Sequence, residues 1–306
     1  MARTSPRPAH QPCEHGYDGV MSDPAPVTPS PTPTPLTAGA ASDLELAAEL
    51  LASARHVVVL TGAGVSKESG IPTFRGEGGL RATNGEPPMN GFQLFLEDSA
   101  GWWRQRLERR HTEQANPTSF ARAVDEAQPN AAHHALAELE RMDVVHHLIT
   151  QNVDDLHRRA GQQEITEIHG NRHWLRCLDC GTRWPQREFP VDEAGELPPR
   201  CAQPGCDGVI KDDTVMFGEP IPTEALARCD AQTRRADCFL VVGTSAVVMP
   251  AAGFPLLAWQ RGVPLVEVNP EPTPLTEYAE VSCRSAAGAL LPELASALRS
   301  RLGASA

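Results

Sequence analysis

The segment from residue 56 to residue 75 carries the clearest chemical pattern of the chain. Residues 56–60 form a short apolar run that is typical of a buried parallel strand. Gly62 and Gly64 follow it, where backbone N–H groups can approach a pyrophosphate at the start of a helix. Lys67 stands where the third glycine of G-x-G-x-x-G belongs, so the two glycines alone fit an ordinary tight turn equally well. The tail 69–75 adds apolar side chains and a guanidinium suited to phosphate or ribose, and this addition favours a nucleotide.

Four of the eight cysteines lie in one short window, as Cys177-x2-Cys180 and Cys201-x4-Cys206. This spacing is typical of a zinc ribbon, in which two turns direct four sulfurs at one tetrahedral ion. The second pair has two more residues between its cysteines than is common. Four unrelated thiols are the alternative, and disulfides would need an oxidising compartment, for which no export signal is visible. The remaining cysteines are scattered and are expected to be core or surface thiols: Cys13, Cys229, Cys238 and Cys283.

Alternating strand-like and helix-like runs predict a doubly wound parallel sheet of Rossmann-like type, in the α/β class. Strands are expected at 144–150, 239–242 and 264–268, and helices at 131–141 and 251–260. Ligands of such sheets lie at the carboxyl ends of the strands. Gly62, Asn152, Gly243 and Asn269 all fall at or just after such ends, so we expect them to meet at one edge.

The remaining segments differ from this pattern. Residues 1–40 are rich in proline, serine and threonine and predict a disordered tail, with a docking site for a proline-binding partner as the alternative. Asp43 is expected to cap a helix that ends near Ala54. Residues 76–130 lack strand periodicity and predict a helical insertion, which contains two tryptophans and a run of arginines.

Composition sets the broad class. The chain has 306 residues, of which 41% are apolar, so it can bury a large core. Its formal net charge of −12 argues against direct nucleic acid binding and against an anionic membrane as partner. No apolar run reaches the length of a membrane span, and we expect a cytoplasmic location.

Five motifs in one order resemble those of the sirtuins, the NAD-dependent protein-lysine deacylases. They are residues 61–75, 151–157, 167–170 and 217–219, and residues 243–245 together with Asn269. The likeness runs from about residue 44 to about residue 298. It implies a catalytic domain at 41–306, with a Rossmann-like lobe formed mainly by 41–75, 131–172 and 211–306. The small lobe is expected to combine the helical insertion 76–130 with a zinc module at 173–210 that holds one structural zinc.

The resemblance also assigns roles to individual residues. His169 corresponds to the catalytic base, and an imidazole suits proton removal near neutral pH. Asp154 is expected to accept a hydrogen bond from the nicotinamide carboxamide, and Asn152 to bond ribose or an ordered water; Asp155 is expected to be solvated. The full NAD set is Gly62, Ala63, Gly64, Ser66, Ile71, Phe74, Arg75, Gln151, Asn152, Asp154, Gly243, Thr244, Ser245 and Asn269. An edge strand for the acyl-lysine peptide is expected to include Val215, Phe217, Gly218 and Glu219.

The acyl group and the acceptor remain open at this stage. Deacetylation is the leading expectation, with removal of succinyl or long-chain acyl groups next. The Tyr-x-x-Arg pair of sirtuins that act on acidic acyl groups is absent, although Arg106 and Arg109 have the same spacing and could serve, or could form a solvated basic face. Transfer of ADP-ribose to protein is a second enzyme class that the same pocket would allow. A non-catalytic zinc-containing binding module is disfavoured because Asn152, Asp154 and His169 are all present.

Overall fold

The computed structural model describes residues 38–75, 79–80, 85–115, 120–189, 191 and 195–304. The expected disordered tail lies outside these residues, except that residues 38–40 form the first turn of α1 (Ala38–Ser53). The helix therefore begins five residues before Asp43, and the prediction that Asp43 caps it is wrong. Alanine is the strongest helix former, and the alanines before Asp43 extend the helix past the expected cap.

A six-stranded, fully parallel sheet forms the larger lobe, in the order β3-β2-β1-β7-β8-β9. Its strands are β1 (Val57–Thr61), β2 (Val145–Thr150), β3 (Ile165–Glu167), β7 (Cys238–Val242), β8 (Leu265–Val268) and β9 (Val281–Cys283). The doubly wound α/β prediction is confirmed. The strand order reverses between β1 and β7, which is the point where such sheets bind dinucleotides.

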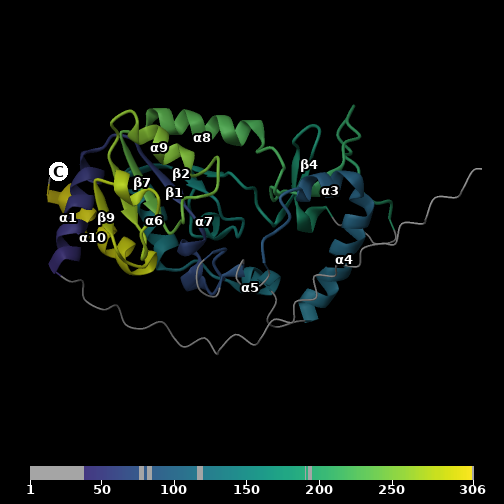
Figure 1. Cartoon of the computed structure of the whole chain (residues 1–306), viewed down its shortest axis with the longest axis horizontal. Helices are drawn as coiled ribbons and strands as arrows, with labels where there is room; N and C mark the ends of the chain where they lie inside the picture. The colour runs from purple at the N-terminus through teal and green to yellow at the C-terminus, as the bar shows by residue number, and fades with distance from the viewer. Residues whose placement is uncertain are drawn as a thin grey trace, which may run out of the picture.

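Helices cover both faces of this sheet (Figure 1). One layer contains α1, α6 (Ala131–Arg141) and α10 (Ala287–Ala304), and its apolar side chains pack on those of β1, β7 and β8. The other contains α8 (Thr223–Arg235) and α9 (Gly253–Trp259), which pack on the opposite faces of the same strands. Both faces are buried, so the strands read as continuous apolar runs in the sequence.

The smaller lobe combines helices with a three-stranded antiparallel sheet in the order β5-β4-β6. Its elements are α3 (Gly91–Glu97), α4 (Ser99–Ala115), α5 (Phe120–Glu126), β4 (Trp174–Cys177), β5 (Arg183–Pro185) and β6 (Ile210–Asp212). Trp103 of α4 is 2% exposed and packs against Leu175 of β4 and Ile210 of β6. Its indole N–H donates to the Ile210 carbonyl at 2.9 Å, so α4 is fixed to the cysteine-bearing sheet. No helix in the described part of the chain is long and apolar enough to cross a bilayer.

Candidate functional site

Two glycine turns meet where β1 and β7 end. A Cβ on Gly64 would lie 2.7 Å from the Gly243 carbonyl oxygen, and one on Gly62 would lie 2.7 Å from the Thr244 Cβ. The Gly64 N–H donates to Gly243 O at 2.7 Å, and the Gly62 N–H donates to Val242 O at 3.2 Å. These two N–H groups are thus used inside the protein, and the approach of other N–H groups of the turn to a pyrophosphate stays a prediction. The glycines allow the two turns to pack backbone against backbone at the switch point of the sheet.

A buried polar network lies directly behind this turn. The Asn152 amide donates to Gly62 O at 3.1 Å and to Ser66 Oγ at 3.0 Å. The Ser66 hydroxyl donates to Asp154 Oδ2 at 2.6 Å, and the Leu156 N–H donates to Oδ1 at 3.0 Å. Burial raises the pKa of Asp154, while the two hydrogen bonds lower it. Asp154 is only 5% exposed, so this carboxyl group is held in a site with little water.

Two buried histidines, His133 and His157, lie next to this network, and neither was expected to have a role of its own from the sequence. His157 Nε2 lies 3.0 Å from Thr61 Oγ1, and His133 Nε2 lies 3.5 Å from Ser66 Oγ. Their ring centroids are 4.8 Å apart. Burial lowers the pKa of His133 to about 4 and lowers that of His157 well below its usual value, so both are neutral at pH 7. His157 begins the short helix α7 (Leu156–Arg159) together with Leu156, and that position next to Asp154 was the clue available.

His169 has one ring nitrogen bound and one available. Its Nδ1 lies 3.1 Å from the Gln151 carbonyl oxygen, which can only accept, so Nδ1 carries the proton and Nε2 carries the lone pair. Burial lowers the pKa of His169, and the hydrogen bond to Gln151 raises it in part. The Gln151 side chain in turn donates to Thr244 Oγ1 at 2.9 Å. The structure therefore joins the loop after β2 to the loop after β7 through Gln151.

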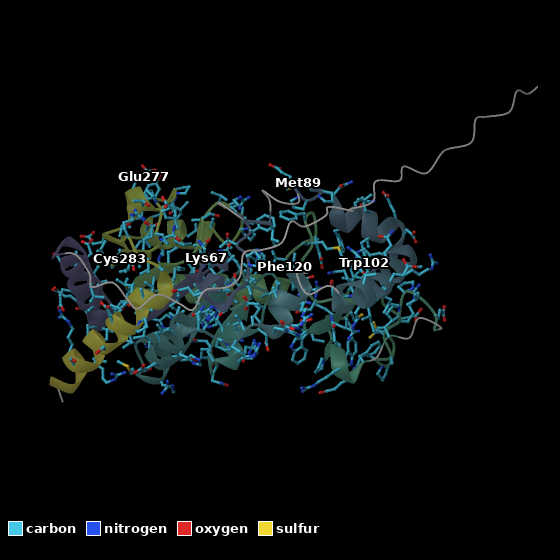
Figure 2. The ribbon with its side chains drawn as sticks, turned by 90° about the horizontal axis from the view of Figure 1, so that it is seen from below. Lys67, Met89, Trp102, Phe120, Glu277 and Cys283 are labelled. Atoms are coloured by element: carbon cyan, nitrogen blue, oxygen red, sulfur yellow. The ribbon has the colours of Figure 1, made fainter. Side chains whose placement is uncertain are left out.

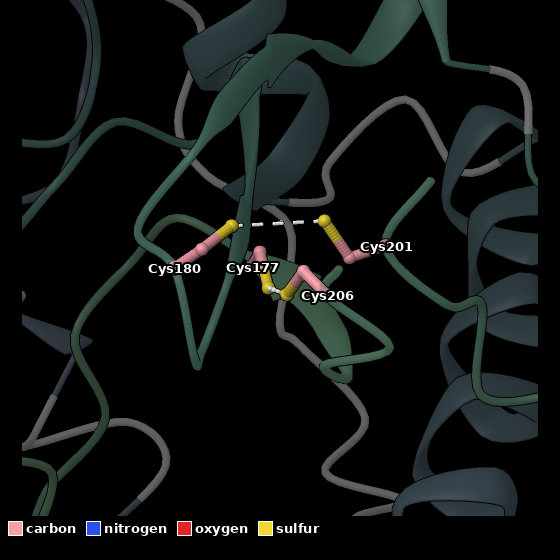
Figure 3. A group of neighbouring side chains, drawn as sticks. All are labelled: Cys177, Cys180, Cys201 and Cys206. Atoms are coloured by element: carbon pink, nitrogen blue, oxygen red, sulfur yellow. Dashed lines mark hydrogen bonds between the residues drawn. The ribbon is translucent and has the colours of Figure 1, made fainter. Parts of the chain in front are cut away.

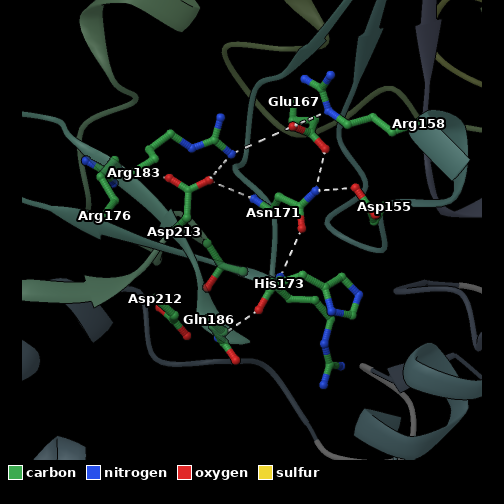
Figure 4. A network of polar contacts seen from close by, with 12 residues as sticks. Asp155, Arg158, Glu167, Asn171, His173, Arg176, Arg183, Gln186, Asp212 and Asp213 are labelled. Atoms are coloured by element: carbon green, nitrogen blue, oxygen red, sulfur yellow. Dashed lines mark hydrogen bonds and ion pairs between the residues drawn. The ribbon is translucent and has the colours of Figure 1, made fainter. Parts of the chain in front are cut away.

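Charged side chains hold Asn171, which lies two residues after His169, and Figure 4 shows this network. The Asn171 amide donates to Glu167 Oε1 at 2.6 Å and to Asp155 Oδ1 at 2.7 Å. A Cβ on Gly170, which has φ +78°, would lie 1.9 Å from Asp213 O, so only glycine fits next to His169. Asp155 is partly exposed, as expected, and its carboxylate also accepts the hydrogen bond from Asn171.

The remaining predicted NAD residues lie around the same edge with different exposure. Ile71 is buried with Val124 and Leu156, whereas Ser245 is exposed and Ala63 half-buried. The Arg75 guanidinium lies 5.6 Å from the centre of the Phe74 ring. Asn269 follows β8, but its amide donates to the Glu271 carbonyl at 2.7 Å and closes its own turn.

The segment 215–219 does not form the expected edge strand. It makes a turn in which the Glu219 N–H donates to Met216 O at 3.0 Å and Gly218 has φ +82°. The buried Glu219 carboxylate forms salt bridges with Arg176 at 2.5 Å and with Lys211 at 3.1 Å. It therefore anchors this turn instead of facing a peptide. The Val215 N–H donates to His169 O at 2.8 Å. The Phe217 ring lies 6.2 Å from the Phe74 ring, centre to centre, which brings the segment to the end of the glycine loop.

The four cysteines of the small lobe converge on one point, as Figure 3 shows. All four sulfurs lie within 4.8 Å of one another, and the closest pairs, Cys177 with Cys206 and Cys180 with Cys201, are 3.6 Å apart. A tetrahedral zinc thiolate site with Zn–S bonds of about 2.3 Å requires sulfurs about 3.8 Å apart. The donor set and spacing fit one zinc with no open position, which makes the site structural.

Comparison with known proteins assigns the family. Residues 62–250 match the family model described as the Sir2 family. The chain belongs to the Sir2 family. It is 41% identical over 255 residues to NAD-dependent protein deacylase 1 of Archaeoglobus fulgidus, a match that covers 82% of this chain and 96% of that relative. It is 44% identical to the NAD-dependent protein deacylase of Thermococcus kodakarensis, with 81% and 93% covered.

Solved Sir2 structures share the fold. A Sir2 homologue in complex with NAD has a TM-score of 0.66 at 40% identity, and the match covers 84% of this chain and 94% of that one. A Sir2 structure with a p53 peptide and NAD⁺ has a TM-score of 0.62 at 31% identity, with 84% and 97% covered. In this Sir2 chain, Gly62, Ser66, Asn152 and Asp154 form one hydrogen-bonded group, and His169 is tied to Thr244 through Gln151.

Proposed function

We propose that the protein is an NAD-dependent protein-lysine deacylase. The observation that carries the proposal is a neutral His169 whose Nε2 is available, on the loop next to the buried Asn152, Ser66 and Asp154 group. Both lie at the carboxyl ends of strands beside the switch point of a doubly wound sheet, where a dinucleotide fits. Relatives at about 40% identity are named NAD-dependent protein deacylases, which supports the same reading.

The position of each side chain in the site indicates its role. NAD, when bound, supplies the glycosidic bond to nicotinamide whose cleavage drives acyl transfer from lysine. Asn152, Ser66 and Asp154 would hold the polar end of the nicotinamide half, and Asp154 offers a carboxylate in a dry site, where hydrogen bonds to it are strong. His169 Nε2 is the group positioned to remove a hydroxyl proton, and the Gln151 carbonyl holds its ring in the required tautomer. Ile71 and Phe74 would exclude water.

The substrate we infer is an acyl-lysine in an extended peptide, with acetyl as the first choice. The proximity of Phe74 and Phe217 supports this, because it brings the glycine loop to the turn at 215–219. We place the activity in the cytoplasm as part of the same proposal. Seven described cysteines are free thiols, and four of them are grouped as a metal site and not as disulfides, which suits a reducing compartment.

The experiment that tests this function follows nicotinamide release with acetyl-, succinyl- and long-chain acyl-lysine versions of one peptide. We expect one nicotinamide and one free lysine per turnover, with the unacylated peptide as control. Nicotinamide release that labels the protein or peptide with ADP-ribose would assign the chain to ADP-ribosyl transfer. No acyl-dependent release with any of the three peptides would reject the proposal.

A further inference from the structure

A large cleft between the two lobes is not explained by the proposed reaction. It has a volume of about 1440 Å³, and its walls come from α4, α5, α7, the start of β4 and the segment 185–187. Neither His169, Ser66, Asn152 nor Asp154 lines it. Eight arginines and four carboxylates do, in a chain whose formal net charge is −12. The cleft is thus a local excess of positive charge on an acidic protein.

These arginines are at least partly exposed to solvent, but they come from several separate elements and not from one helix face. Arg109 and Arg110 come from α4, Arg159 from α7, and Arg172 from the loop before β4. Arg104 lies on the same helix as Arg109 and is exposed, yet it does not line the cleft. Figure 2 shows Phe120 between Lys67 of the larger lobe and Trp102 of the smaller, and both aromatic residues belong to the wall of the cleft. The charges therefore converge from separate elements onto an aromatic-lined hollow.

Only some of the guanidinium groups have an acidic partner. Arg106 lies 3.2 Å from Asp212, and Arg172 lies 3.2 Å from Asp125. Within the described ranges, neither Arg109 nor Arg110 has a carboxylate within 4 Å. Arg159 donates only to the Ala127 carbonyl and to the Gln128 side chain. Three guanidinium groups of the cleft are therefore left without a neutralising charge.

The like charges also act on one another. Burial lowers the pKa of Arg106, and the charges of Arg172, Arg110 and Arg109 lower it further, against the opposing effect of Asp212. Like charges that line one cleft repel one another, and a bound anion relieves that repulsion. A concave wall of protein also concentrates the field, which increases the attraction of an anion from solution.

The cleft shares one segment with the catalytic residues. Asn152 and Asp154 bond Ser66, whereas the alternate residues Val153 and Asp155 line the cleft. Asp155 has φ +67° and is held by Asn171, two residues after His169. A ligand in the cleft would therefore contact the segment that carries Asn152 and Asp154.

We propose that this cleft binds a compact anion with two or more negative charges, through Arg109 and Arg110, which have no acidic partner among the residues that the structure describes. Planar guanidinium groups bind phosphate and carboxylate oxygens in pairs, and the aromatic walls suit a ligand with a flat or apolar part. We take the anion to be free in solution, such as a polyphosphate, and the charged end of an acyl group on the substrate is the alternative outcome of the test. These sources share the same chemistry, and kinetic comparison separates them.

The test is calorimetric titration of the full chain with inorganic tripolyphosphate, without NAD or peptide, so that the result does not depend on the proposed activity. We expect saturable binding that weakens as potassium chloride is raised and that falls at least about tenfold in the double variant Arg109→Gln/Arg110→Gln. Arg104→Gln is the matched control, since it removes a neighbouring exposed charge of α4 outside the cleft. Absence of saturable binding, or an equal loss in Arg104→Gln, would overturn the proposal.

The source of the anion follows from kcat/KM for succinyl- and acetyl-lysine in one peptide. If the double variant lowers the succinyl value about tenfold and leaves the acetyl value unchanged, the acyl chain carries the anion. If both values are unchanged while tripolyphosphate binding is lost, the ligand is a free anion.

Discussion

Replacing Lys211 with methionine tests the buried charge cluster that holds the turn at 215–219. Lys211 is 0% exposed, and its ammonium lies 3.1 Å from Glu219 Oε2 and 3.2 Å from Asp212 Oδ1. It also donates to the Thr214 carbonyl at 2.5 Å. Methionine keeps most of the volume and removes the charge. The variant would leave two buried carboxylates with one cationic partner fewer each.

The expected loss of stability depends on the cationic partners that Glu219 and Asp212 keep in the variant. Removing one partner of a buried ion pair costs about 3–5 kcal/mol. Glu219 keeps Arg176 at 2.5 Å and Asp212 keeps Arg106 at 3.2 Å, so we expect the lower end of that range. At about 1.5–2 °C per kcal/mol for a chain of 306 residues, a loss of about 3 kcal/mol should lower Tm by about 4.5–6 °C.

Thermal unfolding followed by far-UV circular dichroism measures this change. Lys67→Met is the control, because Lys67 is the other lysine of the chain and is exposed. A second variant, Lys211→Met/Glu219→Gln, also removes a carboxylate charge that Lys211 balances, so it should lose less stability than Lys211→Met alone. If Lys211→Met melts within about 1 °C of the wild type, the cluster does not stabilise the fold and the reasoning is refuted.

Three further predictions concern the glycine turn, the base and the metal. Gly64→Ala should weaken NAD binding more than about tenfold, measured by calorimetry, because its Cβ would lie 2.7 Å from Gly243 O. An unchanged affinity would contradict the close packing of the two turns. Gly303→Ala is the control, because a Cβ at Gly303 has no atom within 4 Å. Because burial lowers the pKa of His169, the neutral form persists below pH 6.5, so kcat/KM should fall only at more acidic pH; a fall that begins above pH 7 would argue against this base. Elemental analysis should find one zinc per chain, and Cys201→Ser should unfold the small lobe at lower temperature; folded, active protein without metal would exclude the site.

The strands β1, β2, β7 and β8 were predictable from the sequence because each is an almost continuous buried run, whereas the three-residue edge strands β3 and β9 were not expected. Every expected strand of the parallel sheet lies within one residue of the observed one, and the helix 131–141 has the predicted bounds. Its cap was not predicted, although the Asn130 side chain accepts from the His133 N–H and from the Ala132 N–H. The local sequence pattern was sufficient to predict these elements, and tertiary contacts changed their bounds little.

The wrong or missing predictions concern residues whose conformation or role depends on tertiary contacts. An edge strand at 215–219 fits the local sequence, but the buried salt bridges of Glu219 fold it into a turn. His133 resembles an ordinary core histidine until α6 is placed against the glycine loop, where it meets Ser66. The arginine cleft could not be predicted from the sequence either, because its charges come from helices and loops that only the fold brings together.

The central claim is that His169 is the base of an NAD-dependent deacylation, and one paired measurement tests it most directly. In His169→Ala, NAD affinity by calorimetry should stay within about threefold of the wild type, while acetyl-lysine turnover falls at least about 100-fold. His134→Ala, an exposed histidine of α6, should leave both quantities unchanged. Near-wild-type turnover in His169→Ala would contradict the account.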